Sequence, residues 1–240
     1  MAGALSRLRS GAYGALAETR KAAAVTVVAV SAAFASTLAP AAAQAEVVIA
    51  ALGDSLTQGF GLPPEQGFVP VLEGWLHTRG QDVRLVNAGV SGDTTAGGLS
   101  RVGWTLTPEI DAMIVALGGN DLLRGIDPSV SRANLDGILE AASAAGVEVL
   151  LIGISAPGNY GPEFKAAFEA MYPELADTHG ALYEANFLAG LEAARDNGAQ
   201  VGDVMQADAI HPNAKGVKII VETLGPQVEA LVERVLASEG

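Results

Sequence analysis

The sequence predicts an open α/β sandwich, in which helices cover both faces of a parallel β-sheet. After residue 46, short apolar runs alternate with longer stretches that carry apolar residues at helical spacing. Two of the short runs, residues 47–52 and 112–117, are apolar at every position, which is typical of strands buried on both faces. Right-handed crossovers between such strands give a doubly wound sheet, whose ligands bind at the carboxyl ends of the strands.

Each element follows from its own segment. Five short apolar runs are expected to form the strands: residues 47–52, 83–86, 112–117, 147–154 and 181–184. Five longer segments are expected to form the main helices: residues 68–79, 94–106, 129–145, 162–179 and 213–236. The last helix should be interrupted near Gly225-Pro226, because proline lacks the N–H that a helix interior needs. With no internal repeat or low-complexity linker after Glu46, residues 46–240 are expected to form one domain.

Residues 1–45 have the pattern of a secretory signal peptide. Four basic residues precede an apolar stretch over residues 22–35, and small residues follow up to Ala43-Gln44-Ala45. A basic start, a short apolar core and an A-x-A site predict cleavage after Ala45 and export to the periplasm or the medium. The alternative is an uncleaved membrane anchor, although the apolar core is shorter than the roughly 20 residues that span a bilayer.

Charge and cysteine content exclude several classes of function. The 240-residue chain has 14 Lys+Arg, 27 Asp+Glu and no cysteine. Removing residues 1–45 takes away 4 basic residues and 1 acidic residue, which leaves 10 against 26 and a net charge of −16. Such acidity disfavours nucleic acid and anionic membranes as partners. The absence of cysteine excludes disulfides, thiol nucleophiles and thiolate zinc sites.

Polar residues follow the predicted strands and form the inventory of a serine hydrolase. Ser55 lies directly after the first strand, where its hydroxyl can project into the crevice as a nucleophile. His211 would accept the proton of that hydroxyl as general base. Asp208, three residues earlier, would hold the imidazole tautomer and stabilise the imidazolium. The oxyanion would be bound by the backbone N–H groups of Ser55 and Gly92 and by the Asn120 side-chain amide.

Each of these residues also has a structural interpretation. A serine after a strand is most often a helix cap, and Asp208 could cap the last helix. Of the other two histidines, His77 is expected to be a half-buried surface residue. His179 is expected to sit at a helix C-terminus, where the macrodipole favours a cation. The catalytic interpretation is preferred because four separate segments place suitable groups at the same edge of the predicted sheet.

The sequence resembles the SGNH (GDSL) hydrolases, in particular their thioesterase, lysophospholipase and arylesterase branch. The resemblance extends from about residue 47 to 236 and rests on four blocks that occur in the family's order. They are Gly53-Asp54-Ser55-Leu56, residues 87–95 (NAGVSGDTT), Gly118-Gly119-Asn120-Asp121 and Asp208-Ala209-Ile210-His211-Pro212. By this resemblance the blocks carry the nucleophile, the oxyanion glycine, the oxyanion asparagine and the Asp–His pair.

The resemblance also implies a flavodoxin-like three-layer α/β/α sandwich of about five parallel strands, without metal or cofactor. It implies a shallow, exposed cleft, whose wall we expect around residues 61–68 and 156–164. Four apolar residues there or nearby would either line an acyl groove or belong to the core: Phe68, Leu122, Tyr160 and Phe164. We expect a monomer that acts on a small-molecule or lipid ester, with no nucleic-acid partner and no stable membrane insertion after signal cleavage.

Three functions are therefore considered. The first is an exported serine esterase that cleaves carboxylic esters or thioesters through an acyl-enzyme. The second is a carbohydrate acetylesterase on the same frame. The third is a non-catalytic nucleotide- or flavin-binding module, which is disfavoured because Gly59-Phe60-Gly61 is followed by Leu62-Pro63-Pro64, so the phosphate-binding pattern G-x-G-x-x-G is broken.

Overall fold

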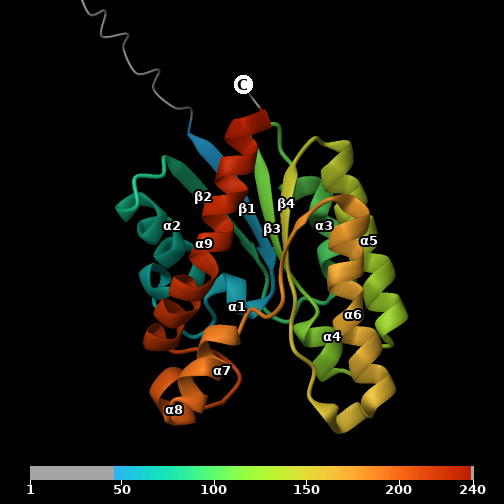
Figure 1. Ribbon diagram of the computed structural model, residues 1–240, viewed down its shortest axis with the longest axis vertical. Coiled ribbons are helices and arrows are strands. Elements are labelled where there is room, and N and C mark those ends of the chain that lie inside the picture. The colour runs from blue at the N-terminus through green and yellow to red at the C-terminus, as the bar shows by residue number, and fades with distance from the viewer. Residues whose placement is uncertain (1–45, 239–240) are drawn as a thin grey trace, which may run out of the picture. The chain divides into compact units, whose positions relative to one another are not determined.

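The computed structural model describes residues 46–238, which contain a five-stranded sheet. The strands are β1 (Val47–Gly53), β2 (Val83–Gly89), β3 (Ala112–Ala116), β4 (Glu148–Ile152) and β5 (Leu182–Glu184). They lie in the order β2-β1-β3-β4-β5, and every neighbouring pair is parallel. The predicted parallel α/β sandwich is thus confirmed, and all five carboxyl ends point to the same edge (Figure 1).

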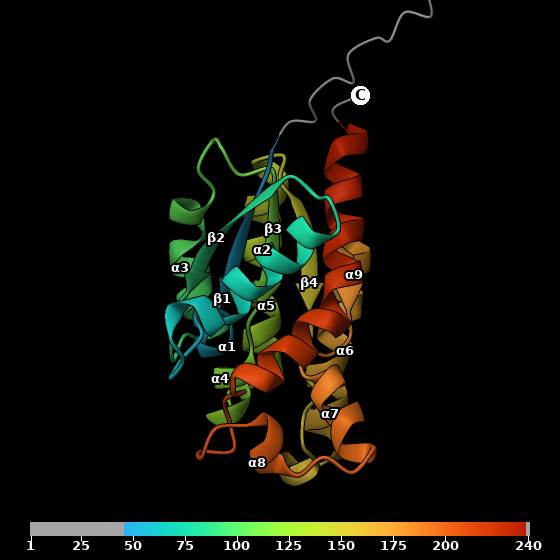
Figure 2. The ribbon, with the colours of Figure 1, turned by 90° about the vertical axis from the view of Figure 1, so that its left-hand side faces the viewer.

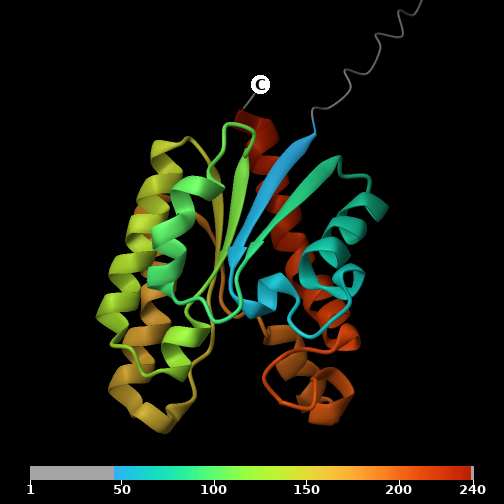
Figure 3. The same cartoon turned by 180° about the vertical axis from the view of Figure 1, so that it is seen from behind.

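Helices cover both faces of the sheet. On one face lie α2 (Phe68–Thr78) and α9 (Ala214–Ser238), whose buried side chains join those of β1 in one apolar cluster. On the other face lie α3 (Thr95–Thr105), α5 (Pro128–Ala144) and α6 (Pro162–His179), which belong to a second cluster. Figures 2 and 3 show the sheet enclosed between these groups.

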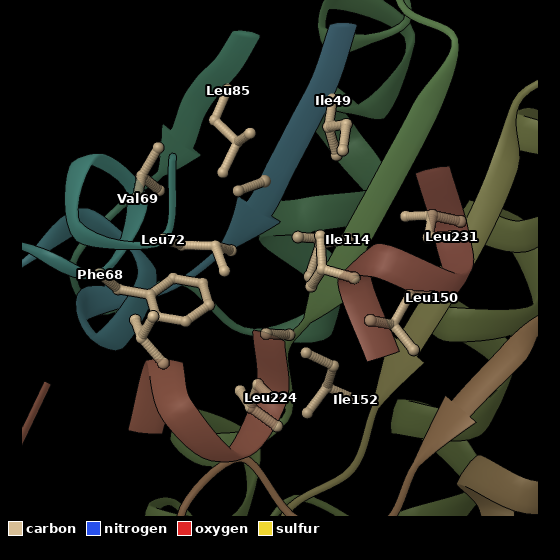
Figure 4. Packing of buried hydrophobic residues seen from close by; sticks show 14 of the residues in the cluster. Ile49, Phe68, Val69, Leu72, Leu85, Ile114, Leu150, Ile152, Leu224 and Leu231 are labelled. Atoms are coloured by element: carbon tan, nitrogen blue, oxygen red, sulfur yellow. The ribbon is translucent and has the colours of Figure 1, made fainter. Parts of the chain in front are cut away.

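Strand β1 lies between β2 and β3, and its alternating side chains reach the apolar clusters on both faces of the sheet. All seven of its residues are buried. Ile49 contributes to the cluster under α2 and α9, whereas Leu52 contributes to the cluster under α3 and α5. Figure 4 shows Ile49 and Ile114 of the sheet in the same packing as Phe68 and Leu72 of α2. Fully burying one such side chain stabilises the fold by roughly 1.5–3 kcal/mol.

The predicted interruption of the last helix was wrong, because α9 runs without a break through Pro226. The helix instead bends part-way along its length (Figure 2). Packing explains the continuity, since Leu224 and Val228 on either side of the proline are fully buried. The ring of Trp75 occupies the space where a side chain at Gly225 would lie, so glycine allows α2 to approach α9 closely. A proline in a helix interior costs about 3 kcal/mol, so the burial of α9 on both sides of Pro226 has to offset that amount.

Short elements that the sequence did not predict gather at the carboxyl edge of the sheet (Figure 1). They are α1 (Ser55–Gln58), α4 (Gly119–Leu123), α7 (Ala189–Asp196), α8 (Val201–Val204) and the 3-10 turns η1 (Pro64–Gln66) and η2 (Gly158–Tyr160). The predicted signal peptide, residues 1–45, lies outside the described residues. None of the helices within residues 46–238 combines the length and the apolar character needed to cross a membrane.

Candidate active site

Ser55 is the first residue of α1, directly after the carboxyl end of β1. The cap of this helix is Asp54, whose Oδ1 accepts a hydrogen bond from the Leu56 backbone N–H at 3.0 Å. The capping role that sequence alone could assign to Ser55 therefore belongs to its neighbour. As a result, the Ser55 hydroxyl is available for another partner.

That partner is His211, whose Nε2 lies 2.9 Å from Ser55 Oγ. On the other side of the ring, His211 Nδ1 lies 2.7 Å from Asp208 Oδ2. Asp208 Oδ1 also accepts the backbone N–H groups of Ile210 and His211, each at 3.0 Å. The carboxylate is thus fixed by the same turn that carries the histidine, and it orients the imidazole toward the serine.

The turn between Asp208 and His211 is conformationally strained. Ala209 has φ of 58°, the left-handed conformation that costs a residue with a Cβ about 1 kcal/mol. It is the only residue other than glycine with positive φ within residues 46–238. Such strain persists where surrounding contacts enforce it, and here the enforced turn brings the carboxylate and the imidazole together.

Asp208, His77 and His179 each have contacts that decide between a structural and a catalytic role. The start of α9 is capped by Asn213, whose Oδ1 accepts the N–H groups of Lys215 and Gly216. Asp208 is therefore free of that task. The other two histidines lie outside the cleft: His77 Nε2 contacts the Val83 carbonyl at 2.8 Å, and His179 Nε2 contacts Asp136 Oδ1 at 2.6 Å.

The three residues that the sequence predicts as oxyanion donors, Ser55, Gly92 and Asn120, all line one cleft. Gly92 follows β2 and has φ of 82°, which glycine adopts without strain. Asn120 lies in the first turn of α4, after β3. Within residues 46–238, the backbone N–H groups of Ser55 and Gly92 donate no hydrogen bond to another protein group. These two N–H groups are therefore available to a ligand, and the Asn120 amide, which donates one N–H to Asp54 Oδ2 at 3.3 Å, has a second N–H to offer.

The pKa values of the two carboxyl groups in the site, Asp54 and Asp208, are shifted in opposite directions. Burial raises the pKa of Asp54 from 3.8 to about 6, although hydrogen bonds from Leu56 and Asn120 oppose this shift. The hydrogen bond from His211 lowers the pKa of Asp208 to about 2. Asp208 is consequently ionised across the neutral range, as an imidazolium partner must be. Asp54, in contrast, is harder to ionise, because burial removes the water that would solvate its charge.

The serine lies on a cleft of about 830 Å³ that runs between two walls. One wall comes from α4 and η2, with Leu122, Leu123 and Tyr160 among its residues. The other comes from α7, α8 and the segments beside them, with Leu191, Val201, Met205, Glu192 and Arg195. In Figure 1, α7 and α8 lie on one side of the carboxyl edge and α4 lies on the other.

Of the four candidate substrate-binding residues, the structure places two on the cleft and two elsewhere. Leu122 and Tyr160 line it. Phe68, the first residue of α2, is 1% exposed and points into the core (Figure 4), where its ring packs against Phe187. Phe164 packs between Tyr160 and Phe168, away from the cleft surface. Both phenylalanines therefore pack in or against the core, which was the alternative to lining an acyl groove.

Several residues of the site were missed at the level of sequence. The ring centroids of Phe60 and His211 lie 4.5 Å apart, whereas the pattern Gly59-Phe60-Gly61 indicates only that a phosphate-binding loop is absent. The α7–α8 wall had no motif to mark it, because its residues come from short helices that follow the last strand. Within residues 46–238, no group of three or more His, Cys, Asp and Glu side chains is arranged to hold a metal ion.

Comparisons with known proteins agree with this geometry. Residues 51–219 match the model of the GDSL-like lipase/acylhydrolase family. The chain belongs to this family. The chain is 40% identical over 193 residues to "Esterase TesA" of Pseudomonas aeruginosa, covering 80% of this chain and 91% of that protein. It is also 33% identical over 182 residues to "Thioesterase 1/protease 1/lysophospholipase L1" of Escherichia coli K12, covering 75% of this chain and 83% of that protein.

Solved structures give the same result. The crystal structure of AlinE4, described as an SGNH-hydrolase family esterase, superposes with a TM-score of 0.63 at 41% identity. The match covers 78% of this chain and 96% of AlinE4. The family resemblance seen in the sequence is confirmed, and this SGNH hydrolase is an enzyme of the esterase and thioesterase type.

Proposed function

We propose that this SGNH hydrolase is an exported serine esterase that cleaves carboxylic ester or thioester bonds through an acyl-enzyme on Ser55. The observation that carries the proposal is the continuous line of contacts from Ser55 Oγ through His211 to Asp208, with distances of 2.9 and 2.7 Å. In this arrangement a neutral hydroxyl can lose its proton as it attacks, which is the requirement for a serine nucleophile.

Acylation begins with attack of Ser55 Oγ on the carbonyl carbon of the substrate. His211 Nε2 takes the hydroxyl proton, and Asp208 stabilises the imidazolium that results. The carbonyl oxygen becomes an oxyanion, which the N–H groups of Ser55, Gly92 and Asn120 bind. Collapse of this intermediate breaks the bond to the leaving group, which receives the proton from His211 and departs as an alcohol or thiol.

Deacylation repeats these steps with water as the nucleophile. His211 removes a proton from the water molecule as its oxygen attacks the acyl carbon of the Ser55 ester. The same three donors bind the second oxyanion, and the proton then returns to Ser55 Oγ as the acid product leaves. Apart from the substrate and one water molecule, the Ser55, His211 and Asp208 side chains and the three N–H donors balance both halves of the reaction.

The cleft walls favour substrates with an apolar acyl group. Leu122, Leu123 and Tyr160 supply apolar surface on the α4 side, and Leu191 and Val201 supply it on the α7–α8 side. Lysophospholipids, aryl esters and other medium-sized esters fit this lining. Acyl-CoA is a less suitable substrate for an exported enzyme because it is cytosolic. A lysophospholipid would also bring a charged head group, for which Arg195 and Glu192 provide opposite charges on one wall.

A carbohydrate acetylesterase is the alternative on the same frame. Acetylated sugars present hydroxyl groups over most of their surface, so a cleft lined mainly by apolar side chains suits them less well. Hydrolysis of p-nitrophenyl acetate, octanoate and palmitate beside acetylated xylan separates the two functions. The lipid or aryl esterase prefers octanoate over acetate, whereas an acetylesterase shows the reverse order and releases acetate from xylan.

Export depends on residues 1–45, which lie outside the described residues. We propose that cleavage after Ala45 releases a monomeric domain that begins at Glu46, into the periplasm or the medium. N-terminal sequencing of protein recovered from culture fractions tests this proposal. An intact N-terminus in the membrane fraction would contradict it.

Ser55→Ala is the direct test of the catalytic proposal. We expect kcat on p-nitrophenyl octanoate to fall at least about 10⁴-fold, since the nucleophile is absent. Labelling by a fluorophosphonate should also be lost. The matched control is Ser155→Ala, which changes an exposed cleft serine that bonds Glu169. Full esterase activity in Ser55→Ala would overturn the proposal.

A further inference from the structure

A buried carboxylate connects the two segments that carry the oxyanion donors. Asp121 follows Asn120 in α4 and is fully buried. Its Oδ2 accepts the backbone N–H of Thr95 at 2.8 Å, and its Oδ1 accepts the Thr95 hydroxyl at 2.5 Å. Thr95 is the first residue of α3 and lies three residues after Gly92. The carboxylate therefore spans from the asparagine donor to the glycine donor.

We propose that Asp121 is a positioning residue that sets the geometry of the oxyanion hole by tying the start of α4 to the start of α3. The inference rests on the proposed function, because it takes Gly92 and Asn120 as the donors. Asp121 touches neither substrate nor Ser55, and it is not among the residues that line the cleft. It acts through its neighbours in the chain.

The surroundings of Asp121 support a rigid connection. Thr95 and Ser131 are also fully buried, and the Ser131 hydroxyl donates to Asp121 Oδ1 at 3.0 Å. Asn134 donates to the Thr95 hydroxyl at 3.0 Å, so this oxygen both donates and accepts. Both carboxylate oxygens are thus occupied, and the α3 N-terminus adds a favourable dipole. Because every polar group in this buried network has a hydrogen-bond partner, the network holds the starts of α3 and α4 in one relative position.

The separation of the two donors matters because they must meet one oxygen atom. Oxyanion donors act when they lie about 2.7–3.1 Å from the position of the developing charge. A misplacement of about 1 Å costs on the order of 100-fold in rate. A second tie between the same segments exists at the surface, where Arg124 Nη2 donates to the Gly92 carbonyl at 2.9 Å. Water competes for this exposed bond, so the buried bonds to Thr95 define the spacing.

The decisive experiment compares Asp121→Ala with Ser131→Ala. Both variants remove hydrogen bonds of the Asp121 carboxylate, but only Asp121→Ala removes the bonds that join α4 to α3. Active enzyme is counted by titration with a fluorophosphonate, so that partly unfolded protein does not distort kcat. We expect Asp121→Ala to lower kcat by about 100-fold on p-nitrophenyl octanoate, with KM changed by less than threefold. Ser131→Ala should keep kcat within about threefold of the wild type.

An inhibitor that forms the oxyanion gives a second readout. Ser55 Oγ attacks the carbonyl carbon of an alkyl trifluoromethyl ketone, His211 Nε2 takes the hydroxyl proton, and the carbonyl oxygen becomes an oxyanion. Its inhibition constant should rise in Asp121→Ala by about the factor lost in kcat, because both depend on the same donors. Asp121→Asn keeps the shape and can still accept the Thr95 N–H, so it should restore most of both values.

If Asp121→Ala does not fold, Thr95→Val decides the question. This variant keeps the backbone bond and removes the hydroxyl bond, and we expect about a tenfold loss of kcat that Thr95→Ser restores. Equal kcat values for the titrated Asp121→Ala or Thr95→Val variant and the wild type would overturn the inference. An active Ser55→Ala variant would instead overturn the proposed function, so the two failures are distinguishable.

Discussion

Replacing Asp54 by asparagine tests how much the buried carboxylate beside the nucleophile costs the fold. Asp54 is 3% exposed, and burial raises its pKa from 3.8 to about 6. The shift is about two units, and each unit corresponds to about 1.36 kcal/mol, so the ionised group costs about 3 kcal/mol. Asp54→Asn removes this cost at neutral pH.

The sign of the effect follows from proton linkage. Below pH 3.8, Asp54 is protonated in both the folded and the unfolded chain, so it carries no penalty. Between pH 3.8 and about 6, the unfolded chain loses the proton while the folded protein keeps it, and stability falls as pH rises. Above pH 6 the penalty is complete. The difference in stability between Asp54→Asn and the wild type should therefore grow from pH 4 to 6 and then stay constant.

Urea unfolding at half-unit steps from pH 4 to 8 measures this difference. An offset that does not depend on pH will also appear, because asparagine changes the contacts with Leu56 and Asn120. Only the slope between pH 4 and 6 bears on Asp54. The control is Asp127→Asn, which replaces an exposed helix cap whose pKa is lowered by its bonds to Ser129. Its difference from the wild type should be flat over the same range.

A second pair of proteins separates the burial of Asp54 from its interaction with the catalytic base. The charge of His211 also acts on Asp54, so the same substitution is repeated in a His211→Gln background. The slope should persist there, since burial is the largest cause of the shift. A difference that stays constant from pH 4 to 8 in both backgrounds would refute the reasoning.

Three further predictions concern the remaining parts of the site. Asn120→Ala should lower kcat by about 100- to 1,000-fold with little change in KM, measured on p-nitrophenyl octanoate, because one oxyanion donor is lost; an equal rise in KM would contradict this role. Ala209→Gly should raise the urea unfolding free energy by up to about 1 kcal/mol, because glycine adopts φ of 58° without strain, and a loss of stability would contradict the strained turn. Arg195→Ala should raise KM for lysophosphatidylcholine by about fivefold, because a surface charge contact contributes about 1 kcal/mol, and should leave KM for p-nitrophenyl octanoate unchanged. The control is Arg84→Ala, which breaks a surface ion pair with Glu46 and should change neither KM value.

The order of apolar runs and helical segments along the chain predicted most of the architecture. Apolar runs without polar interruption can only be buried strands or helices, and their short length selects strands. Since parallel strands end at one edge, the positions of Ser55, Gly92 and Asn120 after successive strands were enough to place them together. The Asp208 and His211 spacing likewise predicted a local pair, because a turn of three residues is a short-range feature.

Other properties depend on contacts between segments that are distant in the chain. Nothing local distinguishes Phe68, which α2 buries in the core, from Tyr160, which lines the cleft. The continuity of α9 through Pro226 depends on packing that no helix propensity contains. The α7–α8 wall and the Asp121 connection join segments tens of residues apart. Sequence patterns determined the strands and the main helices and their order, whereas burial and the spacing of side chains across the cleft were decided only when those elements packed.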